Sequence, residues 1–473
     1  KYILNYSGYP KFLTNFHSTR LSGSGEIFIS MGLLVGSEQF SSVLQFSGII
    51  SLIGIFRKLN FSKINFILLL SAPVIIFFSS SLKPQFFQIC ASGFVFLIII
   101  KELYNKKVNK NLDTIILSLC STILFLNTQV KFSFFLSAYL LSFLLIFLSF
   151  KKKIFIKFIL INLILYFLII FPPLIWKFNN FGGNFFELLY SPFTTNLYGL
   201  EYFKSYLTNL NKGNFVWIIV PQHYRELTQS LGIGCFIFIY LIFKSNNKTD
   251  FLILFSIILF LLITYFHGQN TARFLLEPYI WIILYFSLKF INIKFYKLFK
   301  FAIYSQSLII LSMISYGVIF LSPGVLSKDL REKVLSNHAN GYLFFKWSKN
   351  ELEKLGYNGT IISSKRSIGF LENITIPPEH LYFTDLKKPE AYLYVQEIKK
   401  LKPKYIIYSK ETDLFKIYEN CFIKKVSVGK KIDKHAVRNP FLKSSKFNDI
   451  EIYEFDYKKL PFCISDKKSA YSK

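Results

Sequence analysis

Residues 131–171 read KFSFFLSAYLLSFLLIFLSFKKKIFIKFILINLILYFLIIF, two long apolar runs separated by three lysines. Each run, 131–149 and 153–171, is long enough to cross the hydrocarbon core of a bilayer as a helix, which takes about 20 residues. Three lysines would be costly inside lipid but are favourable in a turn at the membrane surface. This stretch therefore predicts a pair of antiparallel transmembrane helices.

Apolar runs of this kind recur along most of the chain. The 473 residues are 52% hydrophobic, with 56 Phe and 29 Tyr, and their mean hydropathy of +0.39 is too high for a soluble fold of this length. We expect spans near 38–56, 65–80, 84–100, 113–128, 131–149, 153–171, 229–243, 250–266, 274–288 and 299–322. The predicted fold class is an α-helical polytopic membrane protein of about ten transmembrane helices with a small α/β C-terminal soluble domain.

Basic residues divide the connecting loops into two sets. One set holds 17 Lys or Arg in 41 residues, and the intervening loops hold only 7 in 71 residues. By the positive-inside rule the basic set is cytoplasmic. It comprises 57–63, 101–110, 151–157, 244–248 and 289–300. Since the basic residues lie mainly between spans, the net charge of +29 indicates membrane orientation, and we expect no nucleic-acid partner.

The acidic residues concentrate after the last apolar run, which marks a domain boundary. We expect an external loop with a surface helix over 1–37, a transmembrane domain over 38–322 with a large external loop at 172–228, and an extracytoplasmic α/β domain over 323–473. In that domain the predicted strands and helix are Thr360–Ser363, Lys404–Tyr408 and Asp449–Phe455, and Lys388–Leu401. The use of Lys, Ile, Phe and Asn resembles that of AT-rich bacterial genomes, so we expect a bacterial inner (cytoplasmic) membrane.

The cysteines suggest one bridge. Cys90, Cys120 and Cys235 lie inside apolar runs and are expected to pack as small hydrophobic residues. Cys421 and Cys463 both fall in the domain assigned to the extracytoplasmic side, where oxidation is allowed. We predict that they lie within disulfide distance, with two unrelated thiols as the alternative.

Polar residues that could take part in catalysis or binding lie just before the first span. His17, Arg20 and Glu26 belong to a polar, glycine-bearing stretch just outside it. Glu26 is a suitable acid for the first turn of a helix by its charge alone. The functional alternative is that the three residues line a cleft at the membrane surface.

A second group of cations stands on the face that otherwise avoids lysine. Lys83 and Lys131 either extend to the membrane surface as anchors or bind an anionic group. Arg273 begins a span, and Glu277 lies four residues later, so the two could pair on one helix face. Alternatively Arg273, Lys131 and Lys83 bind the phosphate of a lipid donor, for which arginine offers two parallel donors. His267, Gln269 and Glu277 would line the same cleft.

Several enzyme classes lack their signatures. The sequence has no HExxH, GxSxG or Walker-type loop, which argues against a metalloprotease, a serine hydrolase and a nucleotide-driven pump. A glycolipid transporter or flippase stays open as an alternative. Against it, the spans show few Pro or Gly breaks in matching halves.

Three stretches resemble the GT-C superfamily of polytopic glycosyltransferases, which includes protein O-mannosyltransferases and lipid A aminoarabinose transferases. They are Tyr9–Lys11 followed by Gly25 and Glu26, Trp176–Asn184, and Arg273–Tyr279. The resemblance implies inverting transfer of a sugar from a polyprenyl-phosphate donor to an extracytoplasmic glycan, lipid or protein acceptor. It makes no cofactor certain, although a divalent metal is compatible with it.

One departure from the family pattern concerns the catalytic acid. The pattern implies an Asp in the first external loop, and here no acid precedes Glu26. We expect that the Asp lies upstream of Lys1 with a first transmembrane helix. The alternatives are that Glu26 replaces it or that the protein is inactive.

Overall fold

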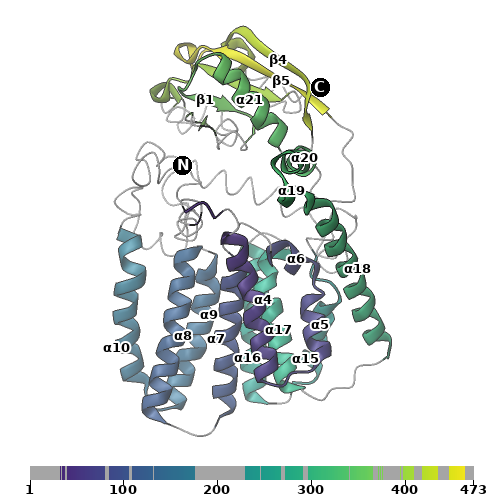
Figure 1. The fold of residues 1–473 in the computed structure, drawn as a ribbon. Helices are drawn as coiled ribbons and strands as arrows, with labels where there is room; N and C mark the ends of the chain where they lie inside the picture. Colours follow the sequence, from purple (N-terminus) through teal and green to yellow (C-terminus); the bar gives the residue numbers. More distant parts are fainter. Residues whose placement is uncertain are drawn as a thin grey trace. The chain divides into compact units, whose positions relative to one another are not determined.

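The computed structural model (Figure 1) shows two kinds of structure, an array of apolar helices and a small sheet. The described residues are Gly32, 35–37, 40–79, 85–105, 109–131, 133–175, 230–245, 247–267, 272–290, 297–339, 341–365, 371, 373, 375–376, 395, 398–409, 418–434 and 447–463. The chain divides into two compact units. The first is mainly His17–Thr195 with Gly199–Met313, and the second is mainly Ile314–Lys473.

Helices make up the described part of the first unit, and many of them stand side by side (Figure 1). They are α4 (Phe40–Lys58), α5 (Lys63–Leu70), α6 (Pro73–Ser79), α7 (Phe86–Tyr104), α8 (Lys110–Val130), α9 (Phe134–Lys151), α10 (Phe155–Leu165), α15 (Phe236–Phe243), α16 (Lys248–His267), α17 (Ala272–Lys289) and α18 (Lys297–Leu321). Seven helices among the described residues are long and apolar enough to cross a membrane. The predicted membrane-like helical character is therefore present.

The helix pair α7 and α17 forms the centre of this unit. Nearly every residue of α17 from Leu275 to Ser287 is buried. Gly93 of α7 permits the close approach, because a Cβ at that position would lie 3.0 Å from Ile280 of α17. Nearby, the rings of Phe96 and Trp281 stack with centroids 4.8 Å apart. By contrast, α10 exposes Ile156, Leu160 and other apolar side chains at its surface.

Two of the expected spans are not simple long helices, whereas a third keeps a proline within a continuous helix. The run 65–80 folds as two short helices, α5 and α6, because Pro73 cannot continue the hydrogen bonding of α5 and starts a new helix instead. The run 229–243 contains Gly232 at a φ of 78°, then a 3₁₀ turn and the eight-residue α15. The run 274–288 is helical throughout, with Pro278 inside α17.

The second unit contains a mixed five-stranded sheet in the order β2-β1-β3-β5-β4. Its elements are α19 (Pro323–Leu326), α20 (Lys328–His338), α21 (Tyr342–Lys354), β1 (Ile361–Ser363), β2 (Thr375–Ile376), β3 (Tyr405–Ser409), β4 (Phe422–Lys434) and β5 (Phe447–Phe455). β1 pairs in parallel with β2 and β3, whereas β5 pairs antiparallel with β3 and β4. The three predicted strands correspond to β1, β3 and β5, and the lysine-rich β4 was not predicted.

Candidate functional site

The start of α7 is capped by a side chain from α4. Gln45 is fully buried, and its Oε1 accepts hydrogen bonds from the backbone N–H groups of Gln85, Phe86 and Phe87 at 3.2, 2.7 and 3.1 Å. The first N–H groups of a helix have no partner within the helix, so a buried helix start needs such an acceptor. This contact fixes the position of Gln85, the residue that precedes α7.

Gln85 connects two of the cations that the sequence singled out. Lys131, at the end of α8, donates from Nζ to Gln85 Oε1 at 3.0 Å. In turn Gln85 Nε2 donates to the backbone carbonyl of Arg273, in the first turn of α17, at 3.4 Å. The start of α7, the end of α8 and the start of α17 therefore meet, and we call this the Arg273 end of the helices.

Both cations also contact one aromatic ring. The Cζ of Arg273 lies 4.7 Å from the ring centroid of Phe274, and the Nζ of Lys131 lies 5.5 Å from it. Each contact is within the range of a cation–π interaction. Arg273 and Lys131, far apart in the chain, are thus brought together in a partly buried position, where two positive charges can form charge-assisted hydrogen bonds to an anion.

Glu277 lies one turn further along α17 and is only 5% exposed. Among the described residues no ion pair joins it to Arg273, so the pairing that a spacing of four allows does not form, and its Oε1 has no hydrogen-bond partner. The hydroxyl groups of Ser92 and Ser137 lie within reach of the carboxyl group. Trp281 donates to the same Ser92 Oγ at 3.3 Å. A buried ionisable group of this kind marks a candidate functional position.

The remaining predicted site residues fall largely outside the described residues. His17, Arg20, Glu26, Lys83 and Gln269 are not among them, and for His267 only the backbone is described. The hypothesis that they line a cleft with Arg273 stays a prediction. Within the described part of the chain, no group of three or more His, Cys, Asp or Glu residues is placed to hold a metal ion.

Sequence reasoning missed the neutral groups that organise this site. Gln45 caps α7, Gln85 links Lys131 to Arg273, and Phe274 contacts both cations. The available signal was a glutamine within the apolar run 38–56, because a buried amide needs hydrogen-bond partners.

Two broken segments meet next to α17. The backbone N–H of Val74, in the first turn of α6, donates to the carbonyl of Ser230 at 3.1 Å. Ser71, in the break between α5 and α6, is 2% exposed, and Ser230 is fully buried. The few Pro or Gly breaks that were expected in the spans include these two, at Pro73 and at Gly232.

Gln306 of α18 stabilises both breaks. Its Nε2 donates to the backbone carbonyl of Ser71 at 2.6 Å, and its Oε1 accepts from the backbone N–H of Ile233 at 3.1 Å. Helix breaks leave backbone groups without helical partners, and a side-chain amide can serve a donor and an acceptor at once. One residue therefore compensates two interruptions.

The other end of the helices carries buried ion pairs. Lys152, at the end of α9, is 1% exposed, and its Nζ lies 2.9 Å from Glu102 and 3.6 Å from Asp113. Asp250, at the start of α16, pairs with Lys289 at the end of α17. Tyr104, at the end of α7, donates to the same Asp250. The ends of α7, α9 and α17 and the starts of α8 and α16 therefore lie together, beside the lysine turn 151–153. We call this the lysine-rich end.

The second unit contains the predicted disulfide. Cys421 and Cys463 are bonded, with Cα atoms 5.1 Å apart, which confirms the expectation drawn from their position in the chain. Both cysteines are buried in the core between Tyr418, Phe455 and Leu460. The other three cysteines are free, and Cys90 and Cys120 are buried as expected.

A buried carboxylate organises the outer strands of the sheet. Glu451 of β5 accepts hydrogen bonds from Lys425 Nζ at 2.9 Å and from the hydroxyls of Tyr408 and Tyr453 at 3.0 Å each. The carboxylate of Glu451, with Tyr453, raises the pKa of Lys425 to about 12. Burial, followed by the contact with Glu451, raises the pKa of Tyr408. Each donor satisfies an oxygen that would otherwise be buried unpaired, so the cluster is structural.

These features define a class of protein: an array of apolar helices with polar groups buried at both ends, followed by a small α/β unit. Comparison with protein families then identifies the chain. Residues 1–335 match the DUF1420 N-terminal domain and residues 336–466 match the DUF1420 C-terminal domain, so the chain belongs to the DUF1420 family. A comparison with curated proteins gave no match.

Proposed function

We propose that this protein is a membrane glycosyltransferase that moves a sugar from a polyprenyl-phosphate donor to an extracytoplasmic glycan, lipid or protein acceptor. The observation that carries the proposal is the contact of both Arg273 and Lys131 with Phe274 at the Arg273 end. A donor phosphate needs fixed positive charge at the depth where its prenyl chain enters the lipid. The likeness of Arg273–Tyr279 to a GT-C segment supports the same assignment.

In this proposal the helices lie in a bacterial inner membrane, with the lysine-rich end in the cytoplasm and the second unit outside. The charge asymmetry of the loops supports this orientation. The Cys421–Cys463 bond is consistent with it, because disulfides persist mainly in oxidising compartments.

The reaction we propose breaks the bond between the anomeric carbon and the phosphate oxygen. The phosphate leaves with the electron pair, and the acceptor oxygen forms a new bond to that carbon while its proton passes to a carboxylate. Arg273 and Lys131 would stabilise the charge on the leaving phosphate. The carboxylate would belong to the first external loop, where Glu26 is the candidate in this sequence and lies outside the described residues.

The test is transfer from a labelled polyprenyl-phosphate sugar, separated by thin-layer chromatography. Arg273→Gln should lower donor use roughly tenfold or more. Arg273→Lys keeps the charge but loses the two parallel donors, so it should fail as well. Lys63→Gln, which removes an exposed lysine at the start of α5, is the matched control. Full activity of Arg273→Lys would show that Arg273 serves only as an anchor.

One observation favours a second function, the transport of a glycolipid. Transporters often bind substrates at discontinuous helices, and the breaks at Ser71–Pro73 and Ser230–Ile233 meet across Gln306. Transport predicts that the labelled donor crosses a vesicle membrane unchanged. Covalent transfer of the sugar by a protein whose helix breaks have been altered would favour the glycosyltransferase over the transporter.

A further inference from the structure

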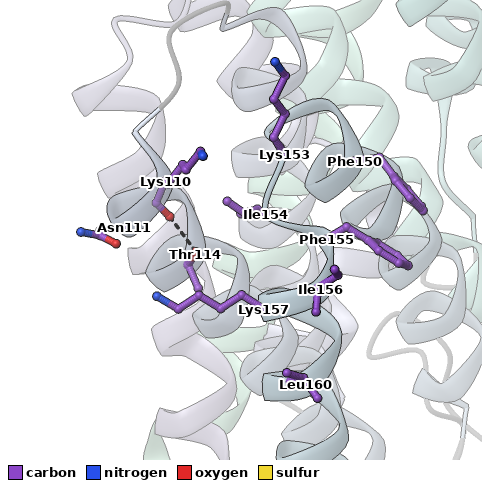
Figure 2. A pocket seen from close by; sticks show the side chains of 10 residues that line it. All are labelled: Lys110, Asn111, Thr114, Phe150, Lys153, Ile154, Phe155, Ile156, Lys157 and Leu160. Atoms are coloured by element: carbon purple, nitrogen blue, oxygen red, sulfur yellow. Dashed lines mark hydrogen bonds between the residues drawn. The ribbon is translucent and has the colours of Figure 1, made fainter.

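The lysine-rich end carries a cavity that the proposed sugar transfer does not use. Its volume is about 700 Å³, and it lies between the start of α8, the turn from α9 to α10, and the start of α10. Figure 2 shows the side chains around it. They are Lys110, Asn111, Thr114, Phe150, Lys153, Ile154, Phe155, Ile156, Lys157 and Leu160. Three lysine side chains and an apolar wall thus line one cavity.

The three lysines of the turn 151–153 have different roles. Lys151 donates to the backbone carbonyl of Leu103 at the end of α7. Lys152 points inward and neutralises Glu102 and Asp113. Lys153 instead lines the cavity. Because Lys152 already pairs with the nearby acids, the cavity retains its positive charge.

Lys153 also occupies a position that usually favours glycine. Its φ is +59°, and the bonds from the N–H of Ile154 to the carbonyl of Ser149 and from the N–H of Lys153 to that of Phe150 form a Schellman motif at the end of α9. A side chain in this left-handed conformation is strained relative to glycine. Strain that is kept in a fold suggests that the side chain has a use.

The cavity offers an apolar wall beside its lysines, which matches the two parts of an amphipathic ligand. The rings of Phe150 and Phe155 stack with centroids 3.8 Å apart, and Ile156 and Leu160 are 75% and 57% exposed. Phe150 lies at the end of α9, and Phe155, Ile156 and Leu160 belong to α10, along which a lipid chain could run. The start of α10 adds its own positive pole, because no side chain caps it.

We propose that this cavity binds an acidic phospholipid, with the phosphate held by Lys110, Lys153 and Lys157 and the acyl chains lying against Phe150, Phe155 and α10. Charge complementarity selects the occupant. Among the described residues none of these three ammonium groups has a carboxylate partner, and acidic lipids are the abundant anions that also bring an apolar chain. The site does not depend on the sugar-transfer proposal.

The experiment compares the full chain in detergent with added dioleoylphosphatidylglycerol or dioleoylphosphatidylcholine, with bound lipid counted by native mass spectrometry. Phosphatidylglycerol should bind more tightly, and Lys110→Gln, Lys153→Gln and Lys157→Gln should weaken it about fivefold each and on the order of 100-fold together. Phosphatidylcholine binding should change little. Equal binding of the two lipids by the unchanged protein would overturn the proposal.

Two controls separate the site from general charge. The triple change of Lys58, Lys63 and Lys297 to Gln removes the same charge from exposed positions outside the cavity and should leave phosphatidylglycerol binding nearly unchanged. An equal loss in this control would refute a specific site. Lys153→Gly relieves the left-handed backbone, so it should weaken lipid binding without lowering thermal stability. If inorganic phosphate displaced the lipid at the lipid's own affinity, the apolar wall would have no role and the lipid assignment would be wrong.

Discussion

Breaking the Cys421–Cys463 bond should strongly destabilise the second unit. The two cysteines are separated by 42 residues. Closing a loop of that length restricts the unfolded chain, which corresponds to about 4 kcal/mol of stability. For a unit of this size the melting temperature should fall by about 10–15 °C. The bond lies in the core beside Tyr418 and Phe455, so alanine is the replacement that leaves no buried polar group.

The assay heats the full chain in detergent and uses proteolysis of the second unit as the measure of its unfolding. Cys421→Ala, Cys463→Ala and the double variant should lose the same stability, since each removes one and the same bond. The reduced unchanged protein should match them. If reduction had no effect, or if the two single losses added in the double variant, the bond would not be the source of the stability.

Three further predictions follow from buried or exposed polar groups. Lys152→Met should lower the free energy of unfolding by about 3–5 kcal/mol in a detergent unfolding titration, because it leaves buried carboxylates unpaired. Lys153→Met should lower it little. Similar losses for both variants would contradict the buried ion pair. Gln306→Leu should cost about 1–3 kcal/mol in the same titration, since two backbone groups lose their partner, and a neutral result would mean that water or other groups replace it. An impermeant maleimide applied to intact cells should modify Asn358→Cys but not Lys153→Cys, and the reverse would overturn the orientation.

The helical character was predictable because hydrophobicity decides it locally. A run such as 131–149 has no charged residue after Lys131, and the structure has α9 there. The sequence shows Pro73 and Gly232, but it does not show that the helix is interrupted there, since proline is also common within membrane helices. Pro278 shows the other outcome, as it lies within the continuous α17. At the two breaks Gln306 serves backbone groups that lack helical partners, and this contact comes from another helix.

The candidate site was predictable only in its charges. Arg273 and Lys131 stood out because cations are rare on their side of the spans, whereas their proximity depends on Gln85 and on the cap that Gln45 provides. Those contacts join different helices, and periodicity within one helix carries no information about them. The strand β4 was missed for a related reason, because its lysines conceal the strand pattern and its pairing with β5 supplies the order.

Lysines have different surroundings at the two ends of the helices. This difference helps to distinguish lysines that only indicate membrane orientation from lysines that could bind an anion. At the Arg273 end Lys131 is positioned by Gln85 and by the ring of Phe274, and the proposed sugar transfer assigns its charge to the donor phosphate. At the lysine-rich end Lys152 forms ion pairs with Glu102 and Asp113, whereas Lys153 beside it lines a cavity. The positive-inside rule counts both residues of that pair equally. Their surroundings differ, since Lys152 pairs with two buried carboxylates and Lys153 lines a cavity for which we propose a lipid. A count of lysines can therefore predict which end faces the cytoplasm, and only the pairing of each lysine can indicate where an anion binds.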